Sequence, residues 1–399
     1  MGINIKMFPA SYGDSFFISF KESEKNEFNL LVDTGFSTTY NSYLKSFFSQ
    51  LKTANRGIDL LVITHIDNDH IRGALKLIPE NGDANNPHLI PIGEIWHNSY
   101  RHLMTGETQL VANLNKIDKK IIKQIEALGY VRDNEDRDVN PDIAAKEGSS
   151  LAKLINHYGY NWNITFDEKA VKCDGPIEII LGSNIRLILL SPDNEKLEAL
   201  RKYWSNKLVE MGYLGPTNIE DYFDDAFEFI VSREKLLNTS NKDISSKIIS
   251  ILEDDEDNFT EDTSSTNGSS IAFALEFDDK KLLFLADSHP KIIEENLKSY
   301  YQEEKLWFDL IKISHHGSKF NTSASLLNLI DSDKYLISTN SKLYNHPDIE
   351  TISRIVRRPT ATKREILFNY KNHLFDFLNN EELKCKYNYD IKIEQEIAF

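Results

Sequence analysis

Potential metal ligands gather where a short apolar run near the N-terminus ends. The run 59–64 predicts a buried strand, and residues 64–70, which read THIDNDH, follow as a loop. A helix is predicted to begin near Ile71 and to stop before Pro79. The loop contains four potential ligands: His65, Asp67, Asp69 and His70. Any fold for this chain must therefore hold a strand, a ligand-bearing loop and a helix in direct succession.

Imidazole and carboxylate side chains without a thiolate suit Zn²⁺, Mn²⁺ or Fe²⁺. A loop leaving a strand in this way can supply ligands to two adjacent cations. The alternative is a polar strand–helix turn with an N-capping aspartate, which four ligand-type residues in six positions make less favourable.

Similar polar residues follow other predicted strands. Asp287 ends the apolar run 281–286, and His315-His316-Gly317-Ser318 ends the run 309–314. Asp33 follows the run 29–32, and a further histidine, His346, lies in the short segment YNHP. These positions extend the set of candidate site residues over most of the chain.

Short β-type runs alternate with helical stretches and with strand pairs joined by hairpin turns. This pattern favours a layered α/β sandwich over a purely parallel sheet. Residues 101–163 are predicted to form a helical insertion or lid, with helices over 110–128 and 144–157. Residues 207–268 form a second insertion, which ends in an acidic, solvated loop at 253–262.

The composition is that of a globular protein with a sizeable core, since 40% of the 399 residues are hydrophobic. The chain has no apolar run of about 18–20 residues, which argues against a membrane protein. Two cysteines and an N-terminus without a secretory signal pattern make the cytoplasm the expected location. A net charge of −16 argues against coating nucleic acid, but permits local contact with phosphate through metal ions.

These motifs resemble those of the metallo-β-lactamase fold hydrolases. That family carries His-x-His-x-Asp-His after a buried strand, whereas this chain has His-x-Asp-x-Asp-His, with Asp67 in place of the second histidine. This variant, together with His-His-Gly-Ser, is similar to the hydrolase domains of bacterial competence DNA-uptake channel proteins. The motifs occur in the family's order between residues 13 and 347. The resemblance implies one αββα hydrolase domain over residues 1–399.

The resemblance also implies a dinuclear centre of two divalent ions, Zn²⁺ or Mn²⁺, with Asp33 orienting a ligand histidine from behind. An aspartate in a simple turn remains the alternative for Asp33. One of His315 and His316 completes the centre, with His316 taken as the ligand, while the other contacts substrate or protonates the leaving group. His97 is interpreted as a satisfied or surface histidine, and a ligand role remains the alternative. The expected ligands are His65, Asp67, Asp69, His70, Asp287, His316 and His346.

By resemblance, the expected activity is hydrolysis of phosphodiesters in DNA or RNA. A water or hydroxide between the cations would attack, and Asp69, His315 and His316 would be the catalytic residues. Ser318, Arg357 and Arg358 are expected to bind substrate, the two arginines from the basic segment 354–364; a solvated helix end is the alternative for that segment. Other possible substrates are cyclic nucleotides, related small phosphodiesters and lactones. A protein of a bacterial defence module is a possible partner, and a non-catalytic scaffold is the alternative to an enzyme.

Overall fold

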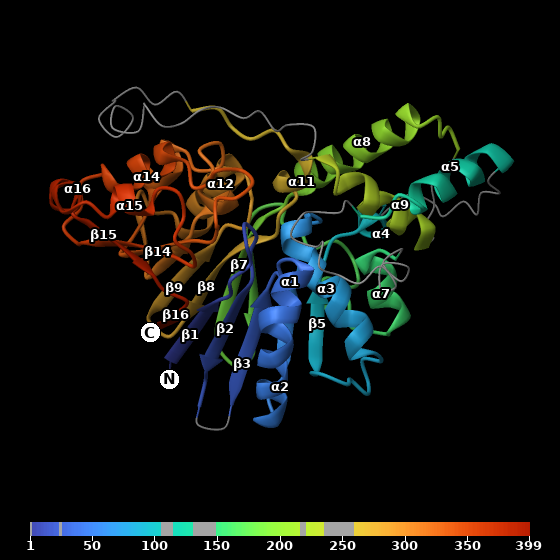
Figure 1. The fold of residues 1–399 in the computed structure, drawn as a ribbon, viewed down its shortest axis with the longest axis horizontal. Coiled ribbons are helices and arrows are strands. Elements are labelled where there is room, and N and C mark those ends of the chain that lie inside the picture. Colours follow the sequence, from blue (N-terminus) through green and yellow to red (C-terminus); the bar gives the residue numbers. More distant parts are fainter. Residues whose placement is uncertain (1, 24–25, 105–114, 131–148, 216–220, 235–258) are drawn as a thin grey trace.

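The computed structural model describes residues 2–23, 26–104, 115–130, 149–215, 221–234 and 259–399 (Figure 1). Its strands are β1 Gly2–Met7, β2 Phe16–Lys21, β3 Glu27–Val32, β4 Ile58–Val62, β5 Ile92–Trp96, β6 Ile177–Leu181, β7 Ile185–Ser191, β8 Ala272–Phe277, β9 Lys280–Phe284, β10 Leu306–Phe308, β11 Leu310–Lys312, β12 Ile330–Ser332, β13 Lys334–Ile337, β14 Arg364–Phe368, β15 Tyr389–Ile393 and β16 Glu396–Ala398. Its α-helices are α1 Ser37–Thr39, α2 Lys45–Thr53, α3 Asn68–Asn81, α4 Tyr100–Leu103, α5 Lys116–Glu126, α7 Leu151–His157, α8 Asn194–Glu210, α9 Asp221–Val231, α11 Ser265–Gly268, α12 Pro290–Tyr301, α13 Ala324–Leu329, α14 Ile349–Val356, α15 Phe375–Leu378 and α16 Glu381–Tyr387.

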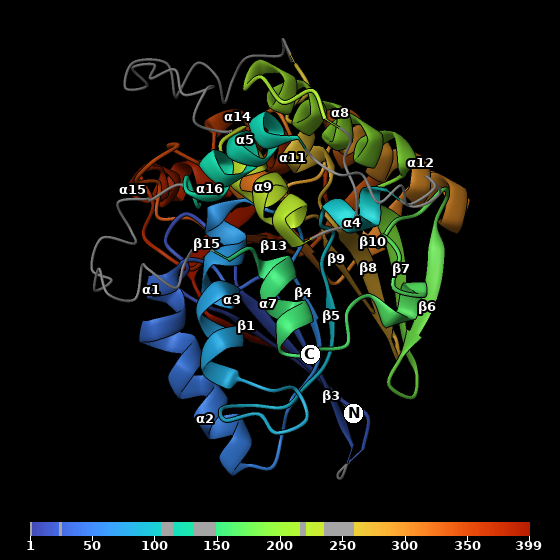
Figure 2. The same cartoon turned by 90° about the vertical axis from the view of Figure 1, so that its right-hand side faces the viewer.

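Two large sheets pack face to face and are covered by helices on both outer sides (Figures 1 and 2). The first sheet has the order β16-β1-β2-β3-β4-β5, and the second has the order β15-β14-β13-β11-β9-β8-β7-β6. Fully buried side chains such as Ile18 and Leu30 from the first sheet and Leu275 from the second form one core between them. Two further cores lie between the sheets and the outer helices. The predicted layered α/β fold is confirmed.

The strand directions bring distant loops together. Strands β3, β4 and β5 run parallel in the first sheet, as do β9, β11, β13, β14 and β15 in the second. Loops that leave the carboxyl ends of parallel strands emerge at one edge of a sheet, which is where open α/β sheets bind ligands. The segments after β3, β4, β9 and β11 therefore meet although they are far apart in sequence.

Two local predictions were wrong. Helix α3 begins at Asn68 and continues through Pro79 to Asn81, so the proline lies in the last turn and does not end the helix. Strand β5 was not predicted, because Gly93 interrupts its apolar pattern. A Cβ at Gly93 would lie 2.6 Å from the carbonyl oxygen of Asp59, so this position needs glycine for close packing against β4.

The described parts of the predicted insertions contain helices. Helices α5, α7 and α9 contribute Ile122, Ile155 and Phe227 to a core shared with α3. The rest of the two predicted helices, and most of the predicted acidic loop, lie outside the described residues. None of the helices in the described ranges combines the length and apolarity that a membrane span requires.

The basic segment 354–364 is largely used by the fold. Arg364 is fully buried and forms a two-point ion pair with Asp331, with Nη2–Oδ2 and Nε–Oδ1 distances of 2.7 and 3.1 Å. Arg358 also contacts Asp331, donates to the carbonyl oxygens of Leu327 and Ile330, and contacts the Tyr335 hydroxyl. These contacts give the expected substrate-binding role of Arg358 no support.

Removing the buried charge of Arg364 should destabilise the fold. Arg364→Met leaves Asp331 with only its Arg358 pair in the described structure, and breaking such a pair costs about 3 kcal/mol of unfolding free energy. The matched control is Lys363→Met, whose exposed ion pair with Asp390 should contribute less than about 1 kcal/mol. Urea unfolding measures both changes, and equal losses would contradict the structural role of Arg364.

Candidate metal centre

Asp33 organises the loop that follows β4. Its Oδ1 accepts from the backbone N–H of Thr64, and its Oδ2 accepts from the Thr64 hydroxyl, both at 2.8 Å. The same Oδ2 lies 2.8 Å from Nδ1 of His70, which must donate because a carboxylate only accepts. The Thr64 Oγ1 in turn lies 3.0 Å from Nδ1 of His65. Asp33 thus orients His70 directly and His65 through Thr64, leaving both Nε2 atoms directed elsewhere.

The second sheet supplies Asp287 and the His315-His316 pair. Ala286, just after β9, has a left-handed φ of 47°, and Asp287 follows it. His315 and His316, just after β11, are also left-handed, with φ values of 45° and 53°. Gly317 follows with a φ of 89°, and a Cβ there would lie 2.5 Å from Cβ of Pro347. The glycine of the His-His-Gly-Ser motif is thus required by space as well as by conformation.

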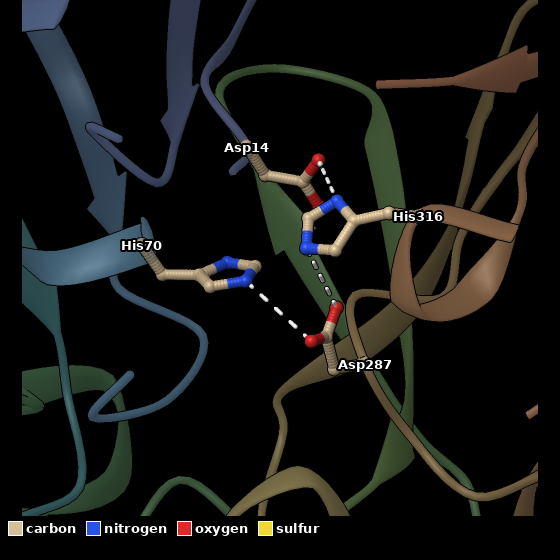
Figure 3. Close-up of side chains that lie close together, drawn as sticks. All are labelled: Asp14, His70, Asp287 and His316. Carbon is tan, nitrogen blue, oxygen red and sulfur yellow. Dashed lines mark ion pairs between the residues drawn. The ribbon is translucent and has the colours of Figure 1, made fainter. Parts of the chain in front are cut away.

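Three fully buried imidazole nitrogens converge on the Asp287 carboxylate, and Nε2 of the more exposed His315 also lies 3.6 Å from that carboxylate. Nε2 of His70 lies 3.6 Å from Oδ2 of Asp287, and Nε2 of His316 lies 3.8 Å from its Oδ1 (Figure 3). Nε2 of His65 lies 3.7 Å from the same Oδ2. None of these three nitrogens has a hydrogen-bond partner among the described residues, and all three are buried. The distances are too long for hydrogen bonds, so the nitrogens surround space that another group can share.

The spacing fits divalent metal ions. Ligand atoms about 2.1 Å from a tetrahedral ion lie about 3.4 Å apart. Nε2 of His65 lies 3.3 Å from Oδ2 of Asp67, and Nε2 of His316 lies 3.3 Å from Oδ2 of Asp69. One candidate group is His65, Asp67 and Asp287, and the other is Asp14, His70, Asp287 and His316. Because Asp287 belongs to both groups, its carboxylate can bridge two ions.

Buried negative charge supports the same conclusion. Among the described residues, five carboxylates that are at most 3% exposed contact the three imidazoles: Asp14, Asp33, Asp67, Asp69 and Asp287. Lys312, itself 1% exposed, forms an ion pair with Asp14 and offsets one of these charges. Burying the rest without cations is costly. Two divalent ions would balance the remaining four.

The pKa shifts of His70, His316 and Asp14 reflect the buried charges around them. Burial disfavours the imidazolium of His70, but Asp33, Asp287 and Asp69 outweigh it and raise the pKa of His70 well above its usual 6.5. Burial likewise opposes protonation of His316, but Asp14 and Asp287 raise its pKa to about 9. Burial would raise the pKa of Asp14, yet Lys312 and His316 lower it. Cations are therefore attracted strongly to this group, whether as protons or as metal ions.

His315 and His316 have different surroundings. Nδ1 of His316 lies 2.9 Å from the carbonyl oxygen of Ser338, which only accepts, so its Nε2 is available to a metal ion. His315 is 14% exposed; its Nδ1 lies 2.9 Å from Oδ1 of Asn321, and its Nε2 lies 3.6 Å from Asp287. Asn321 donates to Asp262 at 3.0 Å. His316 thus lies inside the ligand group and His315 at its more accessible side.

The other residues expected at the site lie outside the two candidate ligand groups. His346 belongs to neither candidate group; its ring centroid lies 5.2 Å from that of His315, and its Nδ1 lies 3.4 Å from Asp348. Ser318 is 1% exposed, and its hydroxyl accepts from the N–H of Phe320 at 3.3 Å. Arg357 is half-buried at the C-terminal cap of α14. His97 is fully buried in an ion pair with Glu228 in α9.

Several residues near the centre were missed from the sequence. Asp14 and Lys312 contact each other and the ligand loops, while Asp262 and Asn321 support His315. Asp14 follows Gly13, where a Cβ would lie 2.0 Å from the carbonyl oxygen of Asp69. That glycine-aspartate pair before β2 was the available signal. Asp262 carried no signal, because it ends a run that predicts a solvated loop.

Comparison with known proteins gives one family match. The model of the metallo-beta-lactamase superfamily matches residues 11–144, and no curated protein matches the chain. The solved metallo-beta-lactamase fold protein YhfI from Bacillus subtilis aligns with 100% of this chain and 98% of its own, at 9% identity and a TM-score of 0.35. CmlA, a diiron beta-hydroxylase from Streptomyces venezuelae, aligns with 99% of this chain at 9% identity and a TM-score of 0.38.

This chain spans 54% of the CmlA chain. Structural likeness at these scores carries no argument about activity. The matched residues 11–144 include Asp14, Asp33 and the whole ligand loop from His65 to His70. The family model thus matches the part of the chain that carries the ligand loop, and the two-sheet α/β architecture is consistent with the metallo-beta-lactamase fold.

Proposed function

We propose that this protein is a metal-dependent hydrolase that binds two divalent cations and cleaves phosphodiester bonds of nucleic acid. One observation carries the proposal. The Nε2 atoms of His65, His70 and His316 converge on Asp287, and none has a hydrogen-bond partner within the described ranges. Such convergence of buried imidazoles and carboxylates is costly without a cation and fits metal-ion coordination.

The donor set divides between two ions. His65 and Asp67 would hold the first, His70, Asp69 and His316 the second, and Asp287 would bridge them. In these positions the cations would polarise phosphoryl oxygens and make hydroxide available near neutral pH. The abundance of oxygen donors suits Mn²⁺ as well as Zn²⁺. Asp33 and the Ser338 carbonyl oxygen would keep His70 and His316 oriented by their Nδ1–H groups.

His315 would act on the substrate side. Asn321 holds its Nδ1, and the 14% exposure of its side chain contrasts with the 1% of His316. Its Nε2 would donate a hydrogen bond to a phosphoryl oxygen or a proton to the leaving group. His346, whose ring lies beside that of His315, would contact the same part of the substrate.

The substrate class rests on the motif combination. His-x-Asp-x-Asp-His with His-His-Gly-Ser resembles the competence-associated branch, whose domains act on nucleic acid. Because Arg358 and Arg364 are engaged within the fold, recognition of phosphate would depend mainly on the cations. Small phosphodiesters and lactones are the competing substrates that the assay below distinguishes.

Metal binding is the first test. The dialysed wild-type protein should bind two Mn²⁺ per chain, measured by titration and elemental analysis. His65→Ala and His70→Ala should each lose at least one ion, because each imidazole belongs to a different candidate group. The control is His157→Ala, an exposed histidine in α7, which should retain both ions. A wild-type protein that binds no divalent metal would overturn the proposed centre.

Activity is the second test. With Mn²⁺, the protein should cleave linear, circular or single-stranded DNA or RNA, while Asp69→Ala and Asp287→Ala should lose activity by more than about 100-fold. That bound follows because losing even an outer partner of a metal ligand costs about 10- to 100-fold. Turnover confined to cyclic nucleotides or lactones would reassign the substrate, and full activity of a folded Asp287→Ala protein would contradict the mechanism.

A third test separates the two adjacent histidines. His315→Gln should keep both ions but lower kcat on DNA by about 10²- to 10⁴-fold, as expected when a general acid is lost. The defect should shrink on bis(p-nitrophenyl) phosphate, whose leaving group needs no protonation. His316→Gln should instead lose an ion. Loss of metal in His315→Gln with retention in His316→Gln would reverse the assignment.

A further inference from the structure

Lys312 is a buried lysine at the end of β11, three residues before the histidine pair. Its side chain is 1% exposed, and its ammonium contacts two groups: the carboxylate of Asp14 and the carbonyl oxygen of Ala286, the latter at 3.1 Å. Burying a lysine is costly unless its charge and its hydrogen atoms are satisfied. Each partner adjoins a proposed metal ligand: Asp14 contacts His316, and Ala286 directly precedes Asp287.

The first partner leads to His316. Asp14 Oδ2 pairs with Lys312, while its Oδ1 lies 3.3 Å from Nδ1 of His316 (Figure 3). Nδ1 is the nitrogen on the side of the ring away from Asp287, so Asp14 contacts the back of the ligand. The neighbouring Gly13 carbonyl oxygen accepts from the Ser338 hydroxyl at 2.6 Å. The loop before β2 is thereby fixed against Ser338, the residue whose carbonyl oxygen lies 2.9 Å from Nδ1 of His316.

The second partner leads to Asp287. Ala286 has a left-handed φ of 47°, which costs a residue with a Cβ about 1 kcal/mol or more. The bond from Lys312 holds the carbonyl oxygen of this residue, and the next residue is the proposed bridging ligand. One ammonium group therefore contacts the supports of two ligands that come from two different strands.

We propose that Lys312 is a positioning residue of the metal centre, which orients His316 through Asp14 and Asp287 through the Ala286 carbonyl oxygen. The proposal rests on the metal centre proposed above but not on its substrate. It also assigns Asp14 as a support and not as a direct ligand, although Asp14 lies close enough to be counted with His70, Asp287 and His316. Oδ2 of Asp14 is engaged by Lys312, and Oδ1, which has no hydrogen-bond partner among the described residues, lies at the Nδ1 side of His316 and not at its Nε2; this placement favours the support role.

Lys312→Met distinguishes positioning from simple electrostatics. Removing a positive charge close to two cations should by itself tighten metal binding. Loss of positioning should instead weaken one of the two Mn²⁺ ions by about 10- to 100-fold, the usual cost of removing an outer partner of a ligand. Mn²⁺ titration followed by electron paramagnetic resonance measures this without any substrate. Unchanged or tighter binding of both ions in Lys312→Met would overturn the proposal, and tighter binding would indicate that the released Asp14 is a ligand.

A double variant covers the case in which Lys312→Met does not fold. Asp14→Asn combined with Lys312→Met removes both buried charges, so the variant avoids an unpaired carboxylate. It should fold and still bind one ion about 10- to 100-fold more weakly than the wild type. Wild-type affinity for both ions in this variant would overturn the proposal. Failure of the wild-type protein to bind two ions would instead refute the centre itself.

Asp331→Asn is the matched control for stability. It removes a carboxylate from the Arg358 and Arg364 ion pairs, which have no contact with the ligand loops in the described structure. The variant should unfold at lower denaturant concentration and still bind both Mn²⁺ ions with wild-type affinity. If it loses an ion as Lys312→Met does, the loss reflects destabilisation and the positioning role is rejected.

Discussion

The crowding of buried carboxylates around three imidazoles is the constraint on which this structure depends. Asp33, Asp67, Asp69 and Asp287 lie within a few ångströms of His65, His70 and His316, and all are nearly inaccessible to water. In an apolar interior such a group is unstable unless cations compensate it. The protein supplies one cation of its own through Lys312. In the proposed centre, metal ions held between the side chains would supply the rest, and folding of this edge would then be linked to metal binding.

The two sheets make this crowding attainable. Ligand loops leave β3 and β4 in one sheet and β9 and β11 in the other, and parallel strands present these loops at the same edge. The large core between the sheets holds the two edges in register. The backbone is left-handed at Ala286, which precedes the proposed ligand Asp287, and at His315 and the proposed ligand His316. This strained backbone is tolerated because the surrounding contacts hold it in place. These contacts are the packed cores, the close approach at Gly317 and the hydrogen bond from Lys312 to the Ala286 carbonyl oxygen.

Sequence reasoning succeeded where a ligand follows its own strand. The apolar runs before His65, Asp287 and His315 predicted strands that the structure contains, and the layered fold followed from their alternation with helices. It failed where a role depends on pairing between distant segments. Asp14 and Lys312 are far apart in the sequence, and no local spacing indicates their contact. Arg358 had the appearance of a surface cation, because the sequence does not show that Asp331, carried on β12, would engage it. Strand β5 was missed for a similar reason. Gly93 breaks its apolar pattern, and the need for glycine there comes from close contact with Asp59 of β4, which the sequence does not show.

These contacts show where part of the net charge of −16 is located. Part of it is concentrated in carboxylates buried at the centre, where the proposed divalent ions would balance it. Arg358 and Arg364, which could have met a polyanion, are instead bound to Asp331. A phosphodiester would therefore be attracted mainly at the metal ions and at His315, over a distance limited by screening. Non-specific binding along a nucleic acid, which needs many surface cations, is correspondingly disfavoured. Under the proposed function, contact with phosphate would therefore depend on the loaded metal centre.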